Sequence, residues 1–412
     1  MSSAIRQDAE KIVRYAIEQN LPGPAVRKVL ADFEEPSGRL LLVAIGKAAW
    51  AMARAAADEL GDKLDAGIVI TKYDHVEAPI EHIVCREAGH PVVDEASVAA
   101  TREAEELVAH LEADDLVLFL VSGGGSALFE DPAVPLEELA DITKQLLACG
   151  ASIDEINCVR KHLSRVKGGR FAQLCAPARV LAVVLSDVVG DRLDTIASGP
   201  AYPDSSTSSD ALNLVERYGL ALSDDALAAL HEETPKALDN VETHITGSVR
   251  ALTASAAKAC AELGYEPLVL TSSLDCEARE AGAFLGAIAR DQAGSDRSLA
   301  FVVGGETVVH LRGAGLGGRN QEFALAAAPA IAGLSDVCVI SVGSDGTDGP
   351  TDAAGGYTDG DTLSKLANQG IDVPAVLDQS DSYHALEACE GLVVTGPTGT
   401  NVNDVAVALI RR

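Results

Sequence analysis

The chain has 412 residues, of which 47% are hydrophobic and only 4% are aromatic. A single hydrophobic core rarely serves more than about 250–300 residues, so two domains are expected. The high hydrophobic fraction argues against a disordered chain. The 32 basic and 62 acidic residues give a formal net charge of −30, which repels the phosphate backbone of nucleic acids and anionic membranes.

In the first half, short β-branched runs alternate with Ala-rich amphipathic stretches. This alternation is typical of βαβ units in a mainly parallel sheet. The predicted strands are Leu40–Ile45, Gly67–Thr71, Leu116–Val121 and Arg179–Leu185. A polar, acidic stretch with little strand signal then surrounds Pro235. We therefore predict an α/β domain with a mainly parallel sheet over residues 1–235.

The second half, residues 236–412, is predicted to form a smaller α/β domain. Its predicted strands are Ile245–Val249, Pro267–Thr271, Leu299–Gly304, Thr307–Leu311 and Val337–Val342. The third and fourth of these are separated by only two residues, which predicts an antiparallel hairpin. A glycine-rich loop follows and runs into an Ala-rich helix that opens at Arg319. The last strand ends in the acidic loop Gly343–Gly356, which lacks the position-twelve glutamate of a calcium loop.

The first candidate for chemistry is Lys47, which follows Gly46 at the end of the first predicted strand. Ligands of open α/β sheets bind beyond the carboxyl ends of the strands, so Lys47 is placed where a phosphate would bind. The glycine spacing of a Walker A loop is absent. The alternative is a solvated lysine at a helix start.

The second candidate is a glycine-rich loop after the strand Leu116–Val121. It consists of Ser122, Gly123, Gly124, Gly125 and Ser126. Successive amides without Cβ atoms can form a concave nest of N–H donors for phosphate oxygens. The alternative is a βα turn that is merely tightly packed. The loop lacks the six-residue dinucleotide fingerprint.

Five basic side chains gather in a stretch of a chain that is otherwise poor in them. They are Arg160, Lys161, Arg165, Lys167 and Arg170. Concentrated cations repel one another unless an anion is present, so Arg160 and Lys161 are candidate ligands of an anionic substrate. The alternative is that these side chains pair with local carboxylates.

Two further candidate positions follow strands or glycines. Asp187 comes after the strand Arg179–Leu185 and could accept a hydroxyl proton or bind magnesium, and Asp191 could bind magnesium or cap a helix. Arg319 opens a helix after Gly318, where the helix dipole and the guanidinium group both favour phosphate or carboxylate.

Together these stretches resemble the class II glycerate 2-kinases, the family with a C-terminal MOFRL-type domain. The resemblance covers nearly the whole chain. Its landmarks are Gly46-Lys47-Ala48-Ala49, Gly89-His90-Pro91, Ser122–Ser126, Glu155-Ile156-Asn157, Val159–Ser164, Lys167-Gly168-Gly169-Arg170, Leu185–Asp191, Ser198-Gly199-Pro200, Gly304-Gly305-Glu306, Gly317–Glu322 and Asp345–Ala354. Each is weak alone, but their joint presence in this order is specific.

The resemblance implies a Rossmann-like N-terminal domain, a smaller α/β C-terminal domain and an active site in the cleft between them. It also implies ATP, Mg²⁺ and D-glycerate as ligands and 2-phosphoglycerate as product. By position, Lys47 and Arg319 are similar to active-site cations, one from each domain. We hypothesise in-line transfer of the γ-phosphoryl group to the C2 hydroxyl, with Ser122–Ser126 holding phosphates. Asp187 is then the base or a metal ligand, and Arg160 or Lys161 holds the substrate carboxylate.

Two alternative functions stay open at this point. An NAD(P)H-dependent hydroxypyruvate reductase would need a dinucleotide fingerprint and a ribose-binding acid, and the sequence has neither. A non-catalytic sensor would close around an anionic metabolite without turnover. Both a monomer and a homodimer are compatible with the sequence.

Further expectations concern the environment of the protein. The carboxylates are spread along the chain, which is typical of proteins kept soluble in concentrated salt, so we predict a halophilic source. The eight cysteines show no CxxC pair and no zinc-type spacing, which indicates a reducing compartment. Without a signal-peptide pattern or an apolar run of about 18 residues, a cytoplasmic protein is expected.

Overall fold

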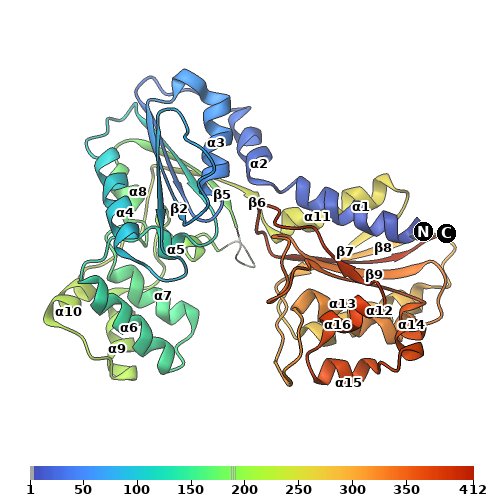
Figure 1. Cartoon of the computed structure of the whole chain (residues 1–412). Helices are drawn as coiled ribbons and strands as arrows, with labels where there is room; N and C mark the ends of the chain where they lie inside the picture. Colours follow the sequence, from blue (N-terminus) through green and yellow to red (C-terminus); the bar gives the residue numbers. More distant parts are fainter. Residues whose placement is uncertain (1–3, 187, 189, 191) are drawn as a thin grey trace. The chain divides into compact units, whose positions relative to one another are not determined.

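The computed structural model describes residues 4–186, 188, 190 and 192–412. It divides into two compact units, which are drawn in Figure 1. The N-terminal unit is Pro22–Thr246, and the C-terminal unit combines the segment up to Leu21 with Gly247–Arg412. The division therefore falls after residue 246, and the boundary predicted from the sequence near residue 235 carried a range of about fifteen residues. That the start of the chain belongs to the second unit was not predicted.

The N-terminal unit contains a six-stranded parallel sheet in the order β3-β2-β1-β4-β5-β6. Its strands are β1 (Leu40–Ile45), β2 (Ala66–Lys72), β3 (Ile83–Ala88), β4 (Leu116–Val121), β5 (Arg179–Leu185) and β6 (Val241–Gly247). The chain runs outward from β1 through β3 and then returns to β4 on the other side of β1. This reversal makes the carboxyl ends of β1 and β4 the switch point at which such sheets bind ligands.

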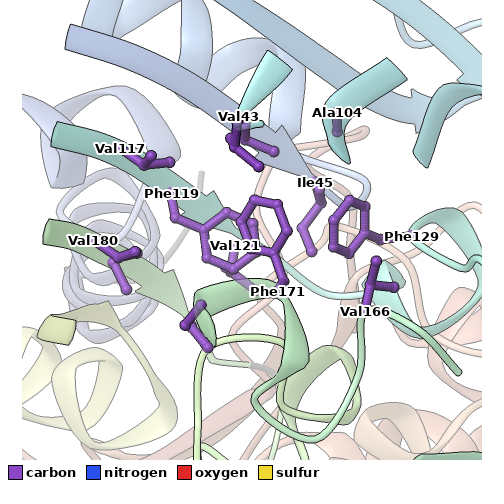
Figure 2. Packing of buried hydrophobic residues seen from close by; sticks show 14 of the residues in the cluster. Val43, Ile45, Ala104, Val117, Phe119, Val121, Phe129, Val166, Phe171 and Val180 are labelled. Carbon is purple, nitrogen blue, oxygen red and sulfur yellow. The ribbon is translucent and has the colours of Figure 1, made fainter. Parts of the chain in front are cut away.

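The central strands are buried because helices cover both faces of the sheet. Alternate residues of β1 point to opposite faces, and Leu41, Val43 and Ile45 share a core with α4 and α8. Figure 2 shows the aromatic centre of this core, where the rings of Phe119 and Phe171 lie 4.8 Å apart. Helix α3 packs on β1, β2 and β4. The helices of this unit are α2 (Pro22–Leu30), α3 (Ala49–Leu60), α4 (Glu95–Leu107), α5 (Gly125–Leu128), α6 (Leu136–Ala148), α7 (Ile153–His162), α8 (Arg170–Cys175), α9 (Ser208–Tyr218) and α10 (Asp224–His231), with 3₁₀ turns at Gly61–Lys63 and Ile196–Ser198.

Helices α6, α7, α9 and α10 share a small hydrophobic core of their own. Helix α7 begins with a capping box between Ser152 and Glu155 and carries the predicted cations Arg160 and Lys161. It ends at His162, and Arg170 Nη1 donates to the carbonyl oxygens of residues 161 and 164, around this helix end, at 2.7 Å each. The basic stretch is therefore only partly helical.

The C-terminal unit contains a mixed six-stranded sheet in the order β11-β10-β9-β12-β8-β7. Its strands are β7 (Glu266–Leu274), β8 (Leu299–Gly305), β9 (Val337–Gly343), β10 (Gly355–Asp359), β11 (Leu392–Val393) and β12 (Asp404–Ile410). Only β7 and β8 pair in parallel. Its helices are α1 (Ala4–Glu18), α11 (Val249–Glu262), α12 (Ala278–Gln292), α13 (Arg319–Ile331), α14 (Thr362–Asn368), α15 (Val373–Asp378) and α16 (Ser382–Ala388). Figure 1 shows α1 and α11 on one face of this sheet and α12 and α13 on the other.

Two details of the predicted second half are wrong. The hairpin does not form, because β8 is already flanked by β7 and β12 and has no free edge for Thr307–Leu311. Within that segment, which the structure describes throughout, Val308 makes only an isolated bridge to Glu277. The predicted strand Ile245–Val249 is displaced, since β6 ends at Gly247 and residue 249 already opens α11.

The α/β class of both units, and the mainly parallel sheet of the first, are confirmed. Among the described residues, no helix has both the length and the apolar character needed to cross a membrane.

Candidate functional site

The loops that follow β1 and β4 are joined at the switch point. Gly46 has φ of 105°, and a Cβ atom there would lie 2.3 Å from the carbonyl oxygen of Ser122. Only glycine fits so close an approach of two backbones. The amide of Lys47 then donates to the carbonyl oxygen of Gly123 at 2.9 Å. The two motifs that the sequence singled out separately therefore form one feature.

Ser122 holds this junction together. Its Oγ donates to the carbonyl oxygen of Ile45 at 3.1 Å and accepts from the amide of Ala48 at 3.1 Å. The side chain is buried. Its hydroxyl is thus engaged by the backbone on both sides, which leaves the glycines of the loop as the groups that can contact a ligand.

The glycines of this loop present unused donors. Within the described residues, the amides of Gly123 and Gly124 have no acceptor. Gly124 has φ of 88°, and a Cβ atom there would lie 3.1 Å from both the His90 ring and Cγ of Lys47. The loop therefore offers free N–H groups bordered by a lysine stem and an imidazole, as an anion requires.

The electrostatics of this corner favour a negative ligand. In the described part of the chain, no carboxylate lies within ion-pair distance of Lys47 Nζ. Burial lowers the pKa of His90, and the nearby ammonium groups of Lys47 and Lys72 lower it further. His90 is therefore neutral near pH 7. The sequence reasoning gave His90 no role, because nothing in its local pattern shows that β3 delivers it to Gly124.

The far end of the loop is fixed from helix α7. Arg160 Nη2 donates to the carbonyl oxygen of Ser126 at 3.0 Å. The Oγ atoms of Ser126 and Ser198 lie 3.0 Å apart, and Ser198 Oγ donates to Asn157 Oδ1 at 3.3 Å. Arg160 Nε is buried and has no hydrogen-bond partner in the part of the chain that the structure describes. The guanidinium group thus lies beside the loop with donor capacity left.

Lys161, the neighbouring candidate, is engaged elsewhere. It is 4% exposed, and its Nζ lies 3.0 Å from Asp204 Oδ1 and 3.8 Å from Asp194 Oδ2. Burial alone would raise the pKa of Asp204, but the Lys161 ammonium and hydrogen bonds from Ser206 lower it. The interpretation that these cations pair with local carboxylates therefore describes Lys161, and also Arg165 and Lys167, which pair with Asp131 and Glu130. Arg160 lies 3.7 Å from Glu130 and in addition donates to the glycine loop.

The two aspartates predicted after β5, Asp187 and Asp191, lie outside the described residues. Ser186, at the carboxyl end of β5, is described and buried. Within the described residues there is no group of three or more His, Cys, Asp or Glu side chains that could hold a metal ion. Magnesium does not need such a group, since one or two carboxylates together with phosphate oxygens usually bind it.

Arg319 lies in the C-terminal unit, at the first position of α13, as predicted for the helix start. Its Nε and Nη2 donate to the two carboxylate oxygens of Asp404 at 2.6 and 3.0 Å, and Nη1 donates to Glu306 Oε1 at 3.0 Å. The side chain of Arg319 is 34% exposed, whereas that of Asp404 is 9% exposed. The guanidinium group is thus held rigidly and still has an exposed part.

This ion pair changes the titration of both partners. Burial raises the pKa of Asp404 to about 6, although the Arg319 guanidinium opposes the shift. Burial alone would lower the pKa of Arg319, but hydrogen bonds to the Asp404 carboxylate raise it instead. The sequence reasoning missed Asp404, because 85 residues separate it from its partner and it stands in no recognisable motif.

The acidic loop after β9 supports the start of α13. Asp348 is buried and accepts hydrogen bonds from the amides of Asn320 at 3.1 Å and Gln321 at 2.8 Å. Burial raises the pKa of Asp348. A Cβ atom at Gly318 would lie 2.3 Å from the Asp348 carboxyl carbon, so glycine is required there. The carboxylate satisfies amides that α13 leaves unpaired and so fixes the position of Arg319.

The structure thus brings Lys47, the loop Ser122–Ser126 and Arg160 together at one edge of the N-terminal sheet. Arg319 belongs to the other unit, so its convergence with Lys47 on one ligand stays a prediction.

Comparisons with known proteins place both units in a family. Residues 8–231 match a family described as a domain of unknown function (DUF4147), and residues 299–404 match the MOFRL family. A D-glycerate 2-kinase of Thermotoga maritima is 52% identical over 413 residues, which span 99% of each protein. A glycerate 2-kinase of Pyrococcus horikoshii is 41% identical over 91% of this chain and 88% of its own length.

A solved structure agrees in fold over the same extent. The crystal structure of a glycerate kinase from Thermotoga maritima matches with a TM-score of 0.96 and 52% identity, covering 99% of this chain and 100% of that one. This chain therefore belongs to the glycerate 2-kinase family, whose members combine a DUF4147 domain with a MOFRL domain.

Proposed function

We propose that this protein transfers the γ-phosphoryl group of ATP to the C2 hydroxyl of D-glycerate, giving 2-phosphoglycerate and ADP. The observation that carries the proposal is the 52% identity, over 99% of both chains, with a D-glycerate 2-kinase. Amides and a lysine that have no partner among the described residues lie at the switch point of the N-terminal sheet, and they supply the anion-binding chemistry that such a reaction needs.

The N-terminal unit is proposed to hold phosphate groups at the glycine loop. The amides of Gly123 and Gly124 donate to phosphate oxygens, and Lys47 supplies the positive charge beside them. Gly125 allows the loop to pass close to Ala197, because a Cβ atom at residue 125 would lie 2.6 Å from the Cβ atom of Ala197. Ser122 and Ser126 hold the two ends of the loop in place. Phosphoryl transfer depends mainly on such positioning and charge neutralisation.

The substrate carboxylate is assigned to Arg160 rather than Lys161. Lys161 is already paired with Asp204, whereas Arg160 keeps a buried Nε without a partner at the end of the loop. A guanidinium group also suits a planar carboxylate, because it can donate two parallel hydrogen bonds. Neutral His90 borders the same loop and can exchange hydrogen bonds with a bound ligand without adding charge.

Arg319 is proposed to neutralise the charge of the group in transfer. The bidentate pair with Asp404 fixes the plane of its guanidinium group, and Nη1 donates to the half-exposed Glu306 on the other side. The mechanism requires Lys47 and Arg319 to reach the same triphosphate when both substrates are bound. Closure of two domains around a substrate is a common way to assemble such a site.

Magnesium fits the proposed donor set, because it prefers hard oxygen ligands from one or two carboxylates and from phosphates. Asp187 and Asp191 are the residues we propose to hold it, and bound magnesium would neutralise charge on the phosphate oxygens. Asp187 is the alternative acceptor of the C2 hydroxyl proton. We place the enzyme in the cytoplasm, where ATP is available. All eight cysteines are free, and a reducing compartment keeps such thiols reduced.

A coupled assay tests the proposal. Purified protein is mixed with D-glycerate, ATP and MgCl₂, and ADP release is followed together with product consumption by enolase without a mutase. Enolase turnover identifies the 2-phosphate, and enolase turnover that begins only after a phosphoglycerate mutase is added identifies the 3-phosphate. NADPH oxidation with hydroxypyruvate is measured in parallel. Binding of D-glycerate without ADP release would overturn the kinase proposal in favour of a sensor.

A further inference from the structure

A fully buried ion pair lies directly behind the glycine loop. The side chains of Lys167 and Glu130 are both 0% exposed, and Lys167 Nζ lies 3.0 Å from Glu130 Oε2. Lys167 Nζ also donates to the carbonyl oxygen of Phe129 at 2.6 Å. A second cation shares the carboxylate, since Arg160 Nη2 lies 3.7 Å from the same Oε2 atom. Two positive charges therefore face one negative charge in the interior.

The cluster is unfavourable as a means of stabilising the fold. Among residues 4–186, 188, 190 and 192–412, neither carboxylate oxygen of Glu130 finds a hydrogen bond of good geometry, and Arg160 Nε finds none. Removing charges from water is costly, and attraction within the pair offsets that cost only when the remaining hydrogen bonds are made. Apolar residues of similar volume often serve a core equally well or better. The geometry therefore points to a role other than stability.

The contacts of Arg160 indicate what that role is. The same Nη2 atom that lies near Glu130 donates to the carbonyl oxygen of Ser126, the last residue of the glycine loop. At 3.7 Å, however, Arg160 is not bound tightly by Glu130. Arg319, by contrast, is bound by Asp404 through two bonds of 2.6 and 3.0 Å. Lys167 is the closer cation to Glu130 and so takes the larger share of its charge.

We propose that Glu130 and Lys167 are positioning residues for recognition of the substrate carboxylate. Glu130 orients the Arg160 guanidinium group toward the glycine loop. Lys167 competes for the Glu130 carboxylate, so that Arg160 keeps donor capacity and positive charge for D-glycerate. The inference rests on the proposed function and deepens it, because it names the residues behind carboxylate specificity.

The test separates substrate recognition from stability. Glu130→Gln keeps the shape of the side chain and removes its charge. The double variant Glu130→Leu with Lys167→Met replaces the pair by apolar side chains of similar volume. We expect each to raise KM for D-glycerate roughly tenfold or more, the effect of weakening a charge-assisted hydrogen bond, with KM for ATP unchanged. The melting temperature of the double variant should match or exceed that of the wild type.

Asp115→Asn is the matched control. Asp115 is a buried carboxylate of the same sheet, but it pairs with Arg39 at the amino ends of β1 and β4, opposite the glycine loop. This variant should lower the melting temperature and leave both KM values unchanged. If the Glu130 and Lys167 variants behave in the same way as this control, the cluster is structural and the inference is overturned.

Two further outcomes are decisive. If Glu130→Gln does not fold, the double variant carries the same KM comparison. If the wild type releases no ADP with D-glycerate, the proposed function fails, and calorimetric Kd values for D-glycerate then test the inference separately. A Kd that weakens about tenfold in the double variant supports it. An unchanged Kd, or no binding of D-glycerate to the wild type, overturns it.

Discussion

Lys47 and Arg319 have the same proposed role but opposite surroundings. Lys47 has no carboxylate within ion-pair distance among the described residues, whereas Arg319 is bound by Asp404 and Glu306. An unpaired lysine gains its partner only when the ligand binds. A paired arginine is oriented before the ligand binds, and only the exposed part of its guanidinium group can contact the ligand. The N-terminal unit therefore offers a ligand-dependent charge and the C-terminal unit a preorganised one.

The largest expected effect is the loss of either cation. Lys47→Ala and Arg319→Ala should each reduce kcat by ~10²–10³ or more, the usual loss when a contact to transition-state charge is removed. Steady-state kinetics with D-glycerate and ATP measure this. Turnover close to that of the wild type in either variant would remove that residue from the mechanism.

The same variants should differ in stability, which sharpens the comparison. Arg319→Ala leaves Asp404 buried without its partner, so its melting temperature should fall, whereas Lys47→Ala should melt like the wild type. Adding Asp404→Asn to Arg319→Ala should restore part of the melting temperature without restoring activity. Equal stability losses in the two single variants would contradict the view that Arg319 supports the fold through its ion pair and Lys47 does not.

A pH profile tests the contribution of the Arg319–Asp404 pair. Burial raises the pKa of Asp404 to about 6. Protonation below that pH removes the negative charge that holds Arg319, so kcat/KM should fall on the acid side. Asp404→Asn should have low activity without this acid limb. An unchanged acid limb in Asp404→Asn would assign it to another group.

Stability should follow the opposite trend in the same range. The pKa of Asp404 is about 6 in the folded protein against an ordinary value of 3.8, so the folded state binds more protons between these pH values. Its contribution to the free energy of unfolding is therefore full below about pH 4 and is lost as the pH rises through about 6. Chemical denaturation of the wild type and Asp404→Asn across this range measures the difference.

Lys167 should show the reverse sign at alkaline pH. Burial lowers its pKa from 10.5 to about 8, although the Glu130 carboxylate opposes the shift. The unfolded chain then binds more protons between these values, so the contribution of Lys167 to the free energy of unfolding should rise as the pH increases from about 8 to about 10.5. The rise should be missing in Lys167→Met, and its persistence there would exclude Lys167 as its source.

The smallest expected effect is the change of melting temperature with salt, because it is spread over the charges of the whole surface. With a net charge of −30, the melting temperature should rise as KCl increases from dilute to molar concentration, because ions screen the self-repulsion. Arg319→Ala should show the same rise in melting temperature, because its partner Asp404 is buried and salt mainly screens exposed charges. A protein that is most stable at low salt would reject the halophilic prediction.

The sequence by itself determined the local elements. The apolar runs Leu40–Ile45 and Leu116–Val121 coincide with β1 and β4, and the glycines before Arg319 mark the start of α13. Continuous apolar runs bounded by glycine specify buried strands and turns through local sterics and burial, so they can be read from neighbouring residues. The family was predicted on a separate ground, the resemblance of its motifs in their order along the chain.

Only the tertiary structure decided which charges are free. Lys161 and Arg160 are adjacent in sequence, yet one pairs with Asp204 and the other reaches Ser126. The predicted hairpin failed because β12, near the end of the chain, takes the edge of β8. Ion pairs and strand neighbours join residues far apart in the sequence, and their strength depends on burial. Neither property can be read from a local pattern.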